Sequence, residues 1–223
     1  MWRDALAVAG KDLRIERRSR VAMQQIVPFA VLVVMLFAFA LDANRTVLTR
    51  TSAGLFWVAV LFSALLAVQR SQTVEGADGV RDATLLSGLD PAGVFLGKSL
   101  AVVVQLLLLE VVLALGVVVL YDVDIDGLPT LVATMLVATV GLAAAGSLYG
   151  ALAGGLRVSE TLLPLLLLPV VAPVLIAATR ASESALDITT VDVAAADWLG
   201  LLGVFAAVYV AFGLVAYGAL MED

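Results

Sequence analysis

Few residues of this chain could do chemistry, because the sequence contains no histidine and no cysteine. Serine–histidine proteolysis and histidine-ligated metal catalysis are therefore excluded. Glu110 is the exception, since it lies near the middle of a long apolar stretch, where an ionised side chain costs about 2.5–3.5 kcal/mol. It could serve a proton or a partner, or it could be a protonated or inward-facing side chain hydrogen-bonded to a neighbouring helix. The sequence leaves both interpretations open.

The chain also lacks a nucleotide-binding loop. Its only Gly-Lys pairs are Gly10-Lys11 and Gly97-Lys98, and the position five residues before Gly97, where the phosphate-binding loop requires glycine, is Ala92. Asp78-Gly79 and Asp82 match a small part of the aspartate motif of lipid-headgroup transferases, but the rest of that motif is missing. We therefore expect a chain that is not an enzyme, with any ATP hydrolysis supplied by a separate subunit.

Most of the chain consists of long apolar stretches, and one of them carries Glu110. Apolar residues make up 62 % of the 223 residues, well above the soluble average of about 45–50 %. A membrane-spanning helix needs about 20 apolar residues, and six stretches approach or exceed that length. They are 26–41, 54–68, 97–120, 128–154, 161–179 and 198–220. The sequence predicts an all-α membrane protein with six transmembrane helices, forming a single domain over residues 1–223.

The charges predict the orientation of these spans. With an inside N-terminus, ten Lys and Arg residues lie on the inner side and only Arg45, Arg50 and Arg180 on the outer side. Because basic loops stay in the cytoplasm, we expect a multi-pass protein of the cell membrane with both termini cytoplasmic. The net charge of −6 argues against nucleic acid as a partner.

The first 22 residues predict an amphipathic helix at the cytoplasmic membrane surface. Trp2, Leu6, Ala9 and Leu13 recur at helical spacing, joined by Ala5, and charged residues occupy much of the remaining surface. Such a helix lies in the interface with its basic side chains toward anionic headgroups. The alternative is a disordered positive tail that only sets the topology.

The longest cytoplasmic connection, residues 69–97, is the candidate docking segment for a partner. Asp90-Pro91 predicts a helix start, with Asp90 as the N-cap and proline at the first helical position. A short helix with exposed leucines before it could fit a groove on a cytoplasmic partner, whereas the alternative is a solvated loop. The candidate docking residues are Arg70, Glu75, Asp78, Arg81, Leu85, Leu86 and Leu89.

Two further spans carry distinctive residues. Pro164, Pro169 and Pro173 remove backbone donors from the fifth span and should kink or break it, either as a functional hinge or as a packing kink. Small residues line the fourth span at three- and four-residue spacing, which lets helices approach closely, in a dimer or inside one chain. These are Gly141, Ala145, Gly146, Gly150, Gly154 and Gly155.

Several stretches, taken in order, resemble the heme exporter protein B family, the permease subunit of the cytochrome c maturation ABC transporter. The similarity lies in Lys11-Asp12-Leu13-Arg14, in residues 54–59 and 65–70, in residues 79–98, and in the proline-rich fifth span. It covers nearly the whole chain. Where relatives tend to have Glu-Arg after the second span, this chain has Gln69-Arg70, and the acidic residues of the docking segment are rearranged.

The resemblance implies an ABC-type permease bundle that works with a cytoplasmic ATPase subunit and other cytochrome c maturation membrane proteins. ATP hydrolysis would be linked to heme handling and to release of a heme-loaded chaperone. Because the chain has neither His nor Cys to ligate heme iron, we expect heme and ATP to be handled by partner subunits. The alternatives are an ABC-type export permease for a drug, lipid or polysaccharide, and a passive scaffold.

Overall fold

The computed structural model describes the chain apart from residues 20–21, 42–43, 76–87, 155–158, 189–193 and 223. Every regular element in the described part is a helix, which confirms the all-α prediction. The elements are α1 (Trp2–Ser19), a π-helical turn η1 (Ala22–Ile26), α2 (Val27–Ala40), α3 (Arg45–Glu75), α5 (Pro91–Tyr121), α6 (Leu128–Gly154), α7 (Ser159–Ala185) and α8 (Ala195–Glu222).

Five of these helices, α3, α5, α6, α7 and α8, are each long and apolar enough to cross a membrane. The sixth predicted span, residues 26–41, corresponds to α2, whose 14 residues extend only about 21 Å. A sixth span is reached when α1 and residues 24–40 count together as one bent pair, with 56° between the two parts. The chain is therefore a membrane protein with five to six spanning helices.

The structure lengthens the second predicted span. α3 extends nine residues before Gly54 and seven after Val68, and it ends at Glu75. The connection predicted for residues 69–97 is correspondingly shorter, because α5 already begins at Pro91. Helical structure thus continues past the apolar part of a span into its polar ends.

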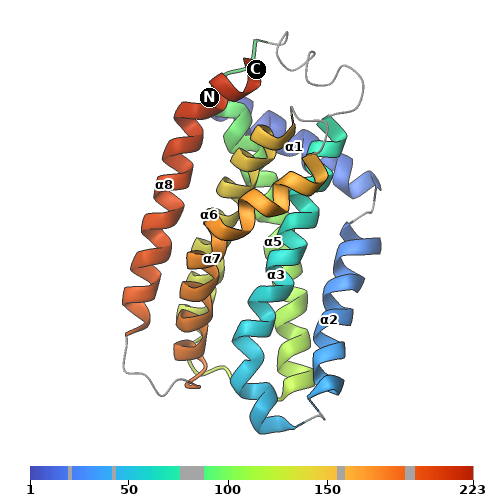
Figure 1. Cartoon of the computed structure of the whole chain (residues 1–223), viewed down its shortest axis with the longest axis vertical. Helices are drawn as coiled ribbons and strands as arrows, with labels where there is room; N and C mark the ends of the chain where they lie inside the picture. The colour runs from blue at the N-terminus through green and yellow to red at the C-terminus, as the bar shows by residue number, and fades with distance from the viewer. Residues whose placement is uncertain (20–21, 42–43, 76–87, 155–158, 189–193, 223) are drawn as a thin grey trace.

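The long helices run side by side, and both termini lie at the same end of the bundle (Figure 1). At this end α1 lies across the bundle against the start of α5 (Figure 1). We call it the α1 end and call the opposite end the far end. The core between them is formed by fully buried side chains of several helices, among them Trp57, Leu106, Leu113 and Val171.

The small residues of α6 serve packing inside the chain. A Cβ added at Gly146 would lie 2.7 Å from the side chain of Val68 in α3, and one at Gly150 would lie 2.7 Å from Gln72. Gly141 faces Phe205 of α8 at 3.1 Å in the same way. Of the two predicted roles for this stripe, the structure therefore shows the internal one.

α7 remains one helix through its three prolines, so the predicted break does not occur. Figure 1 shows the helix bent instead, which agrees with the predicted kink. Pro164 is half-buried, while Pro169 and Pro173 are exposed at the surface of the bundle.

Candidate functional site at the α1 end of the bundle

The structure describes the two ends of the predicted docking segment. Arg70 lies half-buried near the end of α3, and Leu89 is half-buried just before α5. Glu75 is the last residue of α3, and its side chain is not among those described. The middle of the segment lies outside the described residues, including Asp78, Arg81, Leu85 and Leu86. The site is therefore built from the residues on which this segment begins and ends.

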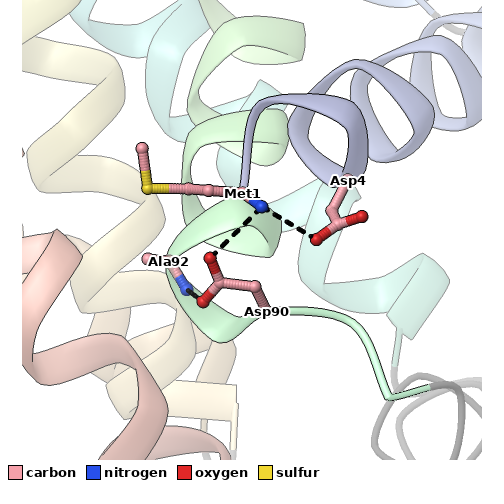
Figure 2. A network of polar contacts seen from close by, with 4 residues as sticks. All are labelled: Met1, Asp4, Asp90 and Ala92. Carbon is pink, nitrogen blue, oxygen red and sulfur yellow. Dashed lines mark hydrogen bonds and ion pairs between the residues drawn. The ribbon is translucent and has the colours of Figure 1, made fainter.

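Asp90 starts α5 as predicted. Its Oδ1 accepts a hydrogen bond from the backbone N of Ala92 at 3.2 Å, and Pro91 follows in the first turn. The other carboxylate oxygen lies 3.5 Å from the amino group of Met1, which also donates to Asp4 Oδ2 at 3.1 Å (Figure 2). The hydrogen bond between Asp4 and the amino group raises the pKa of the Met1 amino group and lowers the pKa of Asp4. One charged cluster thus joins the first residues of α1 and α5.

Two glycines of α5 let α1 approach closely. A Cβ at Gly97 would lie 2.6 Å from the backbone O of Ala5 and 2.7 Å from Cβ of Val8. A Cβ at Gly93 would lie 2.8 Å from the backbone O of Met1. Distances this short leave no room for any side chain, so the two helices contact each other through their backbones.

The buried face of α1 differs from the predicted apolar face. Ala5, Val8 and Ala9 are buried, whereas Trp2 and Leu6 remain 68 % and 65 % exposed. The helix itself is as predicted, but its apolar residues divide between a small-residue side that packs against α5 and a bulky side that does not.

On its other side the start of α5 holds α8. The ring of Phe95 is fully buried and lies against Gly213, where an added Cβ would overlap the ring. Phe95 also packs against the ring of Tyr217, with 5.5 Å between the ring centres. Both belong to a second core cluster that also contains Val8 of α1 and Leu148 of α6. The first two turns of α5 therefore contact α1, α6 and α8 at once.

Charged side chains are buried beneath α1. Lys98 is only 3 % exposed and lies near Asp12 of α1. A cavity of about 30 Å³ between α1, α3 and α5 is lined by Asp12, Arg70 and Gln105, among others. Among the described residues, Asp12 Oδ2 and Arg70 Nε are buried without a hydrogen-bond partner. A water molecule needs about 10–15 Å³ and two or more polar partners, so this cavity suits a water that joins α1 to α3.

Sequence reasoning missed most of this junction. Arg70 was a candidate, but Asp12, Lys98 and the pair Gly93 and Gly97 were not singled out as contacts of α1. The four-residue spacing of the two glycines at the start of a span was the available signal, because it predicts close helix approach.

Glu110 is placed in the middle of the bundle, away from both ends. It is fully buried, and its Oε1 accepts a hydrogen bond from Thr139 Oγ1 of α6 at 2.5 Å. Within the described part of the chain, the second oxygen, Oε2, has no hydrogen-bond partner. The geometry matches the inward-facing side chain, hydrogen-bonded to a neighbouring helix, that the sequence allowed.

The site holds no metal-binding arrangement in the residues that the structure describes, where no group of three or more acidic side chains gathers. Its chemistry is that of helix contact: a capped helix start, close backbone approach, an inserted ring and buried charges.

Comparison with known proteins identifies the family. The family model described as CcmB protein matches residues 3–222. The heme exporter protein B of Haemophilus influenzae is 31 % identical over 184 residues, covering 81 % of each chain. That of Paracoccus denitrificans is 31 % identical over 74 % of this chain and 76 % of the relative, and that of Pseudomonas aeruginosa is 30 % identical over 82 % of each. With a match over nearly its whole length, the chain belongs to the CcmB family.

Proposed function

We propose that this chain is the membrane permease subunit of an ABC transporter complex for cytochrome c biogenesis. A separate cytoplasmic subunit hydrolyses ATP, and the chain couples that hydrolysis to heme handling and to release of a heme-loaded chaperone. The family match and the relatives named heme exporter protein B support this proposal. The apolar helices and the missing nucleotide-binding loop agree with a subunit that depends on a partner for ATP hydrolysis.

The observation that carries the coupling role is the place where the docking segment enters the bundle. The segment leaves α3 and continues into the first turns of α5, which contact α1, α6 and α8. A partner that moved this segment would act on several helices through one rigid junction. We therefore assign ATPase docking to residues 69–97, with Arg70, Glu75, Asp78, Arg81, Leu85, Leu86 and Leu89 as the contact residues.

The proposed orientation places the α1 end in the cytoplasm. Ten of the 13 basic residues fall on that side in the sequence-based count, and the two termini share one end of the bundle (Figure 1). The docking segment then faces the compartment that contains ATP.

Heme in this proposal is held by other membrane subunits of the cytochrome c maturation complex. Thiolate and imidazole are absent from the sequence, so the usual iron ligands must come from elsewhere. The chain would transmit force between those subunits and the ATPase, as one copy or as a homodimer.

The test is co-purification in mild detergent with the cytochrome c maturation ATPase and heme-handling subunits of the same organism. We expect a complex whose ATP hydrolysis depends on this chain. Reversing the charges of Glu75, Asp78 and Arg81 while replacing Leu85 and Leu86 by serine should release the ATPase. The matched control reverses Asp124 and Asp126, exposed residues at the far end, and should leave the complex intact.

Two results would contradict the proposal. ATPase association that survives the docking variant would remove the segment from the interface. Normal folding of the chain without any association would favour an ABC-type export permease for a different substrate, such as a drug, lipid or polysaccharide.

A further inference from the structure

The outer side of α1 is hollowed around Gly10. A Cβ added at Gly10 would meet nothing within 4 Å, so this position is open. The hollow measures about 300 Å³, and its lining includes Lys11, Arg14 and Arg18 together with the apolar Leu6 and Ile15. This volume falls at the lower end of the range of sites that hold small ligands.

The three basic side chains are exposed. Lys11 is 3.2 Å from its neighbour Asp12, whereas Arg14 and Arg18 have no carboxylate partner among the described residues. Two guanidinium groups without a carboxylate, next to an ammonium group, favour an anionic ligand. The guanidinium fork matches phosphate oxygens in particular.

The level of the hollow along the bundle identifies the source of that phosphate. α1 meets α5 at Gly93 near its own start and at Gly97 near Val8. Further along α1, Asp12 and Ile15 line the same cavity as Ala101 and Gln105. Asp12 and Ile15 of α1 therefore lie beside the first turns of the apolar stretch 97–120 of α5, near the end at which that span begins. At the border of an apolar span the bilayer presents its headgroups.

We propose that the hollow at Gly10 binds the headgroup of one anionic phospholipid. Arg14 and Arg18 hold the phosphate, Lys11 adds a third positive charge, and Leu6 and Ile15 contact the apolar part of the lipid next to the headgroup. Because α1 packs against the start of α5, a lipid bound to α1 stabilises the contact between these two helices, at the place where the docking segment ends. This inference stands apart from the proposed transport function.

The site can be tested with the purified full-length chain by native mass spectrometry, adding phosphatidylglycerol or phosphatidylcholine and counting the retained lipid. We expect one phosphatidylglycerol to be retained in preference to phosphatidylcholine. Arg14→Gln with Arg18→Gln should lower the affinity about 30-fold, at about 1 kcal/mol for each basic residue. Gly10→Leu should abolish the preference for phosphatidylglycerol over phosphatidylcholine, because the leucine fills the hollow without changing any charge.

The matched control is Arg3→Gln with Arg17→Gln, which removes the same charge from exposed positions of the same helix outside the hollow. This variant should keep the preference. Loss of the preference in the control, or its survival in Gly10→Leu, would overturn the discrete site in favour of diffuse attraction. Displacement of the lipid by millimolar inorganic phosphate would overturn the assignment to a phospholipid in favour of free phosphate.

Discussion

At the far end of the bundle separate contacts join different pairs of helices, whereas at the α1 end two glycines and an inserted aromatic ring bring α1 and α8 together on the start of α5. In the far half, Tyr121 Oη donates to the backbone O of Val34 at 2.9 Å, and Trp57 Nε1 donates to Ser182 Oγ at 3.0 Å. These bonds join α5 to α2 and α3 to α7, and the backbone N of Gly127, just before α6, donates to the backbone O of Ala185 in α7 at 2.7 Å. Each link there can be lost separately.

The links of the α1 end converge on the first two turns of α5. Gly93 and Gly97 contact α1 there. Phe95, which lies between these two glycines in the sequence, packs against Gly213 of α8. A change at any of these positions disturbs several helices together. Under the proposed function, this difference places the closest helix packing where the proposed docking segment enters the bundle.

Phe95→Ala should have the largest effect on stability. The substitution leaves a cavity in a core cluster shared by four helices, and removing a buried phenylalanine costs about 3–5 kcal/mol. The measurement is the free energy of unfolding in detergent. Phe212→Ala, next to Gly213 but 57 % exposed, is the control and should change little. Equal losses in the two variants would contradict the special role of the α5 start.

Gly97→Leu should separate α1 from α5. The added side chain overlaps the backbone of Ala5, and overpacking of this kind costs about 1–3 kcal/mol. We expect trypsin to cleave after Arg14 and Arg17 much faster than in the parent chain, because α1 no longer packs against α5. Gly116→Leu lies on the same helix with nothing within 4 Å of its added Cβ, and it should leave cleavage unchanged.

Trp57→Phe tests a link in the far half of the bundle. It removes the hydrogen bond to Ser182 and should cost about 1 kcal/mol in the free energy of unfolding. Because the link is local to the far half, trypsin cleavage of α1 should not accelerate. Faster cleavage would show that the two ends are coupled, and the simple contrast between them would fail.

What the sequence could predict depended on how local the cause was. The helix start at Asp90-Pro91 was predictable because a cap is decided by adjacent residues. The division of α1 between Ala5 and Trp2 was not, since periodicity shows which residues share a face but not which element covers it. The length of α3 was underestimated for a related reason: apolarity marks the membrane, while the helix continues through the polar turns that end at Glu75. For the small face of α6, only the positions of Val68 and Phe205 decided between a dimer and internal packing.

Glu110 belongs to neither end, and the smallest expected effect concerns its bond to Thr139. Thr139→Val removes the donor and should cost about 0.6 kcal/mol, the average for hydrogen bonds between helices in membranes. Glu110→Gln keeps a side chain of nearly the same shape, whose amide oxygen can still accept from Thr139. The free energy of unfolding should therefore change by less than about 1 kcal/mol. The two variants separate structure from function when ATP hydrolysis is also measured in the assembled complex. Normal hydrolysis in Glu110→Gln would make the residue a packing contact. Loss of hydrolysis in a stably folded Glu110→Gln variant would show that the complex needs the carboxyl group itself, because the amide preserves the bond between α5 and α6.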